Sequence, residues 1–163
     1  MIIREIQKKD NPEIANIVQS VLLEMGAPKI GTAYSDPFLF ELSQVYSQPK
    51  TIYFVLENEG KIVGGAGIGT LDNDDATICE FQKMYFLPEA RGKGFAAQML
   101  ELSIAKAREF GYSKCYIETM PYMDAAQKLY RKFGFKNLDA PIGNTGHTSC
   151  PVWMLLDLNN QSL

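Results

Sequence analysis

The sequence predicts a single α/β domain that spans residues 1–163 and contains a mixed sheet. Runs rich in β-branched and aromatic residues alternate with stretches whose apolar residues recur at helical spacing, which is typical of this class. A chain of 163 residues fits one domain and leaves no room for a second core of comparable size. With 46% hydrophobic and 21% charged residues, it can bury a core, unlike a disordered segment.

The elements of the first half follow from apolar runs and the residues that interrupt them. In chain order these are a strand over 2–6, a helix over 10–25, a short helix over 38–46, and strands over 51–56 and 61–69. Asp10 can cap the first helix, with Pro12 in its first turn. The turn Asn58-Glu59-Gly60 predicts that the two strands around it form an antiparallel hairpin.

The second half alternates strands and helices. In order we expect a strand over 78–87, a helix over 92–110, a strand over 114–119, a helix over 124–133, a strand near 135 and a last strand over 152–158. Pro88 closes the first of these strands, and Gly111 ends the long helix, whose apolar residues trace one face. The glycine-rich run 64–69 lacks dinucleotide-motif spacing and a following helix, so its glycines are expected to allow close approach of a strand or ligand.

Charge and hydropathy exclude several function classes. Sixteen basic and nineteen acidic residues give a net charge of −3, which argues against a general binder of nucleic acid or anionic membranes. No apolar run reaches the roughly 18 residues of a membrane span, and the N-terminus does not resemble a signal peptide, so a cytoplasmic location is expected. Segment 83–136 carries ten basic and five acidic residues, which suggests an anionic ligand.

Cysteine and histidine are too sparse for a disulfide framework or a zinc site, and no metal is expected. The chain holds Cys79, Cys115 and Cys150, without a CxxC pair, and one histidine, His147. The cysteines are expected to be buried small apolar residues, of which only Cys150 lies near a plausible site.

Residues 87–96, Leu-Pro-Glu-Ala-Arg-Gly-Lys-Gly-Phe-Ala, lead from a strand end through a basic turn into the long helix. The first turn of a helix has unpaired N–H groups and a partial positive charge, so glycines that open the backbone favour a phosphate site. Arg91 and Lys93 are expected to add positive charge at its mouth. The alternative is that Gly92 and Gly94 only make the turn and the cations are solvated.

Residues 82–96 resemble the strand-turn-helix signature of the GNAT superfamily of acetyl-CoA-dependent acetyltransferases, whose turn follows Arg/Gln-x-x-Gly-x-Gly/Ala. Residues 126–135, Ala-Gln-Lys-Leu-Tyr-Arg-Lys-Phe-Gly-Phe, resemble the second block of that family. The resemblance is clear over about 50–136, weaker over 2–25, and absent from 26–50 and the tail. It implies a mainly antiparallel, twisted mixed sheet flanked by helices, with acetyl-CoA as acyl-donor substrate.

The resemblance also implies roles for individual residues. Backbone groups of Met84 and Phe86 would pair with the pantetheine arm, and Tyr130 would stand beside the thioester sulfur as general acid. Many members carry asparagine where this chain has Met123, so a side-chain contact to the cofactor is in doubt. The alternative for Tyr130 is an ordinary core tyrosine. The backbone amides expected to hold the pyrophosphate are those of Arg91, Gly92, Lys93, Gly94, Phe95 and Ala96.

The implied reaction is direct attack of a neutral amine on the acetyl carbonyl, with a backbone N–H of the 78–87 strand stabilising the oxyanion. Glu80 and Glu118 are the candidate bases, acting through water, and Glu80 is preferred. Loops 26–50 and 139–150 should shape the acceptor pocket. His147 either lines that pocket or is a capping or solvent-facing loop residue.

The favoured function is therefore acetyl transfer to a small-molecule amine. Two alternatives stay open, a non-catalytic acyl-CoA-binding sensor and transfer to a protein N-terminus or lysine. The sequence leaves open the identity of the acceptor, N- or O-acetylation, the acyl chain length and a homodimer.

Overall fold

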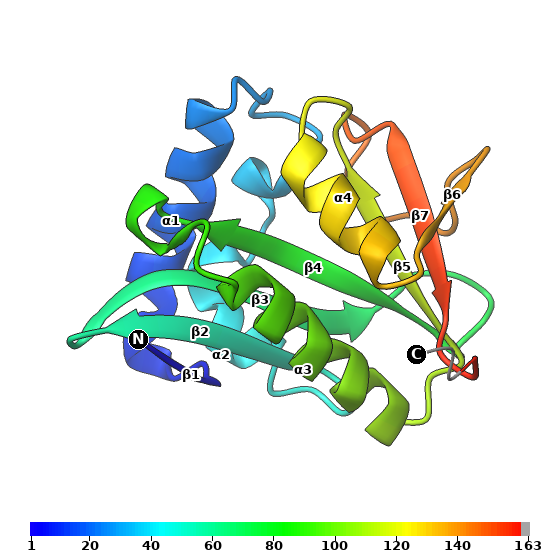
Figure 1. Cartoon of the computed structure of the whole chain (residues 1–163), viewed down its shortest axis with the longest axis horizontal. Helices are drawn as coiled ribbons and strands as arrows, with labels where there is room; N and C mark the ends of the chain where they lie inside the picture. The colour runs from blue at the N-terminus through cyan, green and yellow to red at the C-terminus, as the bar shows by residue number, and fades with distance from the viewer. Residues whose placement is uncertain (161–163) are drawn as a thin grey trace.

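The computed structural model describes residues 1–160, which form one seven-stranded sheet with helices on both faces (Figure 1). The strand order is β1-β2-β3-β4-β5-β7-β6, and every neighbouring pair is antiparallel except β4 and β5. The expected mixed, mainly antiparallel sheet is confirmed. The strands are β1 (Ile2–Glu5), β2 (Ile52–Asn58), β3 (Lys61–Thr70), β4 (Ile78–Phe86), β5 (Lys114–Thr119), β6 (Lys136–Leu138) and β7 (Val152–Asp157).

Four α-helices cover the sheet: α1 (Asn11–Glu24), α2 (Leu42–Val45), α3 (Phe95–Glu109) and α4 (Asp124–Lys132). Side chains that alternate along β2 divide the interior into two cores. Phe54 belongs to the core under α3 and α4, whereas Val55 belongs to the core under α1 and α2. The two cores therefore lie on opposite faces of the sheet, and contact between them is possible only through the sheet.

The sheet opens between β4 and β5. These parallel strands pair only from Ile78–Lys114 to Glu80–Tyr116, and beyond Glu80 the rest of β4 has no pairing with β5. On its other edge β4 contains a bulge, since the register with β3 shifts between the pairs Gly67–Gln82 and Gly65–Tyr85.

The bulge places Lys83 at a φ of 52°, a left-handed conformation that costs a side-chain-bearing residue about 1–2 kcal/mol. The Tyr53 hydroxyl holds it by donating a 2.8 Å hydrogen bond to the Lys83 carbonyl. Glycines on β3 leave room for that tyrosine, because a Cβ on Gly65 would stand 2.6 Å from its ring and one on Gly67 2.3 Å from the Ile52 carbonyl oxygen. The expected close approach at the glycine run is confirmed.

Three sequence expectations need correction. The helix over 38–46 is a 3-10 turn (Leu39–Glu41) followed by the one-turn α2, and the side chains of Phe38 and Phe40 are exposed, so no continuous apolar face exists to hold a longer helix. Asp10 precedes α1 without a side-chain cap, because its carboxylate pairs with Arg4.

The long helix is the third correction. It begins at Phe95 rather than Gly92, since Gly92 and Gly94 have φ values of 70° and 82° and cannot be helical. The strand over 114–119 has the expected bounds.

The three cysteines are free and buried, as expected. Within residues 1–160, none of the helices has the length and apolar character needed to cross a bilayer. A cytoplasmic location and a homodimer stay predictions.

Candidate active site

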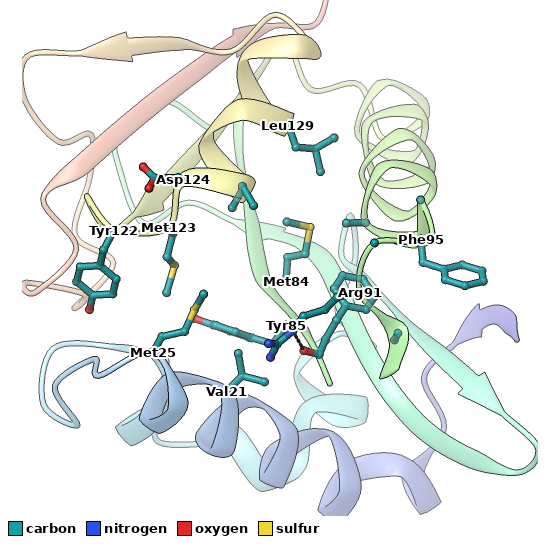
Figure 2. A pocket seen from close by; sticks show the side chains of 17 residues that line it. Val21, Met25, Met84, Tyr85, Arg91, Phe95, Tyr122, Met123, Asp124 and Leu129 are labelled. Atoms are coloured by element: carbon teal, nitrogen blue, oxygen red, sulfur yellow. Dashed lines mark hydrogen bonds between the residues drawn. The ribbon is translucent and has the colours of Figure 1, made fainter. Parts of the chain in front are cut away.

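A cavity of about 380 Å³ lies between the C-terminal half of α1, the end of β4 and the N-termini of α3 and α4 (Figure 2). Seven of the eight residues expected to bind the cofactor line it, and the exception is Lys93. The seven are Met84, Phe86, Arg91, Gly92, Gly94, Phe95 and Ala96. Sequence analysis missed its other wall, because no local pattern shows which helix end faces β4. Val21 of α1, Met25 directly after α1 and Tyr122 contribute to this wall.

The first turn of α3 provides unpaired donors at one end of this cavity. The helix starts after Gly94, and its first backbone hydrogen bond runs from Gln98 N–H to the Gly94 carbonyl at 3.1 Å. The N–H groups of Phe95 and Ala96 therefore have no partner within the helix, and the helix dipole adds partial positive charge there. This arrangement can bind a phosphate or diphosphate. Lys93 is exposed at the same turn.

Arg91 is bound to the protein itself. Its two terminal nitrogens lie 2.7 and 2.8 Å from the Glu24 carboxylate, and its Nε donates to the Phe86 carbonyl at 2.8 Å. The expectation that Arg91 presents free charge at the turn is not met, since Glu24 neutralises it. Arg91 instead ties the turn to α1 and to the end of β4, and it occupies the Phe86 carbonyl.

A smaller cavity of about 60 Å³ opens where β4 and β5 diverge. Phe81 and Tyr130 line it from the α3/α4 face, and Lys83, Glu118 and Cys150 also contribute. The two cavities share four lining residues, so they are adjacent: Met84, Tyr85, Met123 and Ala126. The gap in the sheet thus joins the large cavity to the polar groups near Glu118.

Tyr130 reaches the smaller cavity from α4 and is 5% exposed. Its ring packs against Phe81 at 6.2 Å and Phe135 at 5.8 Å between centroids. Burial raises the pKa of the Tyr130 phenol well above its ordinary value near 10, so the group holds its proton at neutral pH. Its hydroxyl has no hydrogen-bond partner among residues 1–160.

Met123 precedes α4 and lines both cavities. Its sulfur lies 3.4 Å from the Thr119 hydroxyl. Unlike asparagine, methionine has no side-chain amide that could hydrogen-bond to a ligand. Three methionine side chains, Met25, Met84 and Met123, line the large cavity (Figure 2).

Glu80 lies on β4 before the bulge and is only 5% exposed. The Gln82 side-chain amide donates to its carboxylate at 2.6 Å, and the Tyr46 hydroxyl donates to the Gln82 carbonyl oxygen at 2.6 Å. Burial raises the pKa of Glu80 above its ordinary value, which makes it a stronger base than an exposed carboxylate.

Glu118 and His147 are brought to Glu80 by tertiary contacts. Glu80, Glu118 and His147 each have a polar side-chain atom within 4.8 Å of the other two. The hydroxyl of Thr145 donates to the Glu118 carboxylate at 2.6 Å, and so places the 139–151 loop over β5. The structure therefore unites both candidate bases with the histidine. The expectation that no metal is bound stays a prediction.

His147 is held by Asp36, a residue that sequence analysis did not identify. Its Nε2 lies 2.8 Å from one Asp36 oxygen, and Lys83 Nζ lies 2.7 Å from the other. Since a carboxylate only accepts, Nε2 carries hydrogen in this contact. Residues 36 and 147 are 111 positions apart, and nothing in either local sequence indicates that they meet.

These contacts shift both pKa values. Burial alone lowers the pKa of His147, but the hydrogen bond and charge of Asp36 outweigh it, so the pKa lies above 6.5. Burial alone raises the pKa of Asp36, but the hydrogen bond from His147 and the charge of Lys83 bring it to about 2. Asp36 is thus ionised at neutral pH, and its charge stabilises the imidazolium form of His147.

Comparison with known proteins identifies relatives of the whole chain. The sequence model of the Acetyltransferase (GNAT) family matches residues 17–135. "Uncharacterized N-acetyltransferase YjgM" of Escherichia coli is 45% identical over 159 residues, which cover 96% of this chain and 95% of that protein.

Solved structures show the same fold. An acetyltransferase of the GNAT family from Staphylococcus aureus Mu50 superposes with a TM-score of 0.82 at 20% identity, over 96% of this chain and 98% of that one. The putative acetyltransferase yncA from Salmonella typhimurium, solved with its cofactor acetyl-CoA, has a TM-score of 0.77 at 22% identity, over 100% of this chain and 96% of that one.

Proposed function

Because this chain belongs to the Acetyltransferase (GNAT) family and is an acyltransferase, we propose that it transfers the acetyl group of acetyl-CoA to the amine of a small-molecule acceptor. The observation that carries the proposal is the gap between β4 and β5, because it connects the cavity at the N-terminus of α3 with the smaller cavity lined by Glu118, which lies near the buried Glu80. A thioester in the gap would meet both its acid and its acceptor.

The large cavity suits coenzyme A at both ends. The diphosphate would bind to the free N–H groups of the first turn of α3, and the pantetheine arm would run along the unpaired edge of β4. Leu87 N–H donates to the Val63 carbonyl on β3, so by strand alternation the backbone groups of Met84 and Phe86 face away from β3. With the Phe86 carbonyl occupied by Arg91, the groups left for the arm are Met84 and the Phe86 N–H.

The chemistry assigns each proton. The amine nitrogen forms a bond to the acetyl carbon, the Met84 N–H stabilises the oxyanion, and the carbon–sulfur bond then breaks. Tyr130 gives its proton to the departing thiolate and recovers one from the nitrogen, which loses its second proton as the amide forms. Glu80 takes the proton that the acceptor ammonium loses, through water as expected from its depth.

The acceptor side favours a small molecule. Ser149 N–H donates to the Gly31 carbonyl at 3.0 Å, and the Ser149 hydroxyl donates to the Ile30 carbonyl at 3.1 Å. These contacts join the 139–151 loop to the segment after α1 and narrow the approach to Glu80. The cluster of Glu80 and Glu118 also favours an enzyme over a sensor, because binding of acetyl-CoA alone gives these carboxylates no task.

The test combines calorimetry and thiol release. Wild type should bind acetyl-CoA saturably and release CoA thiol with at least one of putrescine, ethanolamine, glycinamide or benzylamine. Tyr130→Phe should lower kcat by about 10²–10⁴-fold with unchanged CoA affinity. Tyr112→Phe is the matched control, since Tyr112 is also buried but donates to Lys50. Binding without transfer to any acceptor, lysine peptides included, would favour the sensor, and equal loss of binding and turnover in Tyr130→Phe would refute the acid role.

A further inference from the structure

The three side chains Glu80, Glu118 and His147 are spaced to share one small polar molecule. Their polar atoms lie within 4.8 Å of one another. Two hydrogen bonds of about 2.8 Å that meet at a tetrahedral angle span about 4.6 Å, so one water can contact all three. The cluster therefore offers a proton a short path between two carboxylates and an imidazole.

His147 and Glu118 are both partly exposed, whereas Glu80 is buried. The His147 side chain is 16% exposed, and Glu80 is 5% exposed and lies deeper on β4. Asp36 fixes the ring by taking the hydrogen on Nε2, which leaves Nδ1 as the nitrogen with a free lone pair. A proton that reaches His147 can thus leave the protein, whereas one on Glu80 is enclosed.

We propose that His147, oriented by Asp36, is a proton-relay residue that takes the acceptor's proton from Glu80 through the shared water and releases it to solvent. This inference rests on the proposed function, because it requires an amine acceptor whose proton Glu80 removes. It adds a group from the 139–151 loop to a reaction whose other parts lie on β4 and α4.

The proton balance of the relay closes. The acceptor ammonium gives a proton to the Glu80 carboxylate and becomes a neutral amine. Glu80 then passes that proton through the water to neutral His147, which becomes imidazolium while Glu80 returns to carboxylate. Imidazolium loses the proton to bulk water before the next turnover.

Charged groups around His147 come from every neighbouring segment. Asp36 of the segment after α1 and Glu80 of β4 favour imidazolium, whereas Lys83 of the bulge opposes it. Glu118 of β5 lies within the same 4.8 Å cluster. The acids prevail and raise the pKa of His147 above its ordinary value, so the imidazole can accept a proton only where the pH exceeds that raised pKa. The relay should therefore fail as pH falls below the His147 pKa.

The chain's single histidine makes the first test direct, because the proton NMR spectrum shows one imidazole to titrate. Asp36→Asn should lower the His147 pKa by about 1–3, and Glu80→Gln should lower it by less. The exposed Asp74 in the β3–β4 turn provides the control Asp74→Asn, which should leave it unchanged. A His147 pKa that ignores Glu80→Gln would overturn the relay, because the two groups would then be uncoupled.

The second test is kinetic and uses the amine that wild type acetylates fastest. His147→Gln should lower kcat about 10²-fold at pH 7 with unchanged CoA affinity and thermal midpoint, and added imidazole should restore part of it whereas acetamide should not. In Asp36→Asn the acidic limb of the kcat–pH profile should move to lower pH by the same amount as the His147 pKa measured by NMR.

The outcomes separate this relay from the proposed function. If wild type acetylates amines but His147→Gln retains full kcat, or EDTA abolishes activity, the relay is wrong and the transferase stands. If wild type acetylates nothing, the proposed function fails, and the relay falls with it whatever coupling the NMR titration shows.

Discussion

Tyr53 and Tyr112 permit a paired test of whether the β4 bulge is a catalytic device. Each tyrosine is buried and donates its hydroxyl hydrogen to the carbonyl of a lysine with positive φ. Tyr53 donates to Lys83, with φ 52°, at 2.8 Å, and Tyr112 donates to Lys50, with φ 60°, at 3.0 Å. Replacing either with phenylalanine therefore removes the same interaction, but only Tyr53 holds the bulge.

The expected loss of stability is similar for both variants. Each leaves a carbonyl without its hydrogen bond in a partly buried setting, which costs about 1–3 kcal/mol. For a chain of 163 residues this lowers the thermal midpoint by about 2–12 °C. Their effects on turnover should differ, because Met84 follows Lys83 directly. A displacement of its N–H by about 1 Å from the oxyanion position can cost about 10²-fold in rate.

The assay is circular-dichroism melting together with steady-state thiol release at saturating acetyl-CoA. Tyr53→Phe should lower kcat at least about tenfold, and Tyr112→Phe should change kcat by less than about twofold, although both melt earlier. If the two variants lose kcat equally, or if Tyr53→Phe keeps wild-type kcat despite its lower midpoint, the bulge does not position the oxyanion donor.

Three further predictions concern the cofactor side. Gly94 and Gly111 lie at opposite ends of α3 with φ values of 82° and 84°, and a Cβ on either would meet open space. Gly94→Ala and Gly111→Ala should therefore each lower the free energy of unfolding by about 1–2 kcal/mol, because alanine is strained at positive φ. Calorimetry should show weaker CoA binding only for Gly94→Ala. Arg91→Ala should weaken CoA binding more than Glu24→Ala does, since it also removes the hydrogen bond that ties the turn to the end of β4 at Phe86; equal effects would show that the ion pair alone matters. Because burial raises the Tyr130 pKa, kcat should show no alkaline loss from this group below about pH 10, and a Tyr130-dependent limb near pH 8 would contradict its role.

The sequence indicated most elements because each depends on local signals. The strand over 114–119 has the expected bounds because a glycine turn precedes it and a proline follows it. The long helix begins later than expected, at Phe95, because the two glycines after Arg91 have positive φ. Segment 38–46 differs from the prediction because its apolar spacing predicts burial, whereas Phe38 and Phe40 are exposed. Amphipathic spacing in so short a segment does not specify what covers it.

The sequence did not predict the bulge in β4, although its effect on two aromatic residues of that strand is clear in the structure. Phe81 and Tyr85 are four residues apart and would share one face of a regular strand, yet Phe81 packs in the core under α3 and Tyr85 in the core under α1. One extra residue reverses the alternation. Two aromatic residues spaced for the same face give no sign that the sheet separates them, so only pairing with β3 shows it.

The polar half of the site depends on pairings of long sequence separation. Glu80 and Glu118 could be chosen from their strand positions, but Asp36 could not, because it sits in a loop and acts only through His147 and Lys83. A lone loop histidine is equally compatible with a solvated cap. Its role becomes visible only when the two loops close over β4.

The glycines of β3 explain how one strand without reactive groups positions all parts of the site. A Cβ on Gly64 would stand 2.2 Å from the Phe86 ring, and one on Gly69 would stand 2.3 Å from the Gln82 side-chain oxygen. Gln82 orients Glu80, Phe86 ends the edge expected to bind pantetheine, and Tyr53, admitted by Gly65, fixes the bulge between them. Methyl groups on β3 would therefore displace Gln82, Tyr53 or Phe86, and with them the proposed base, the proposed oxyanion donor or the edge expected to bind pantetheine. The run 64–69 thus shapes the proposed site although it carries no side chain that could react.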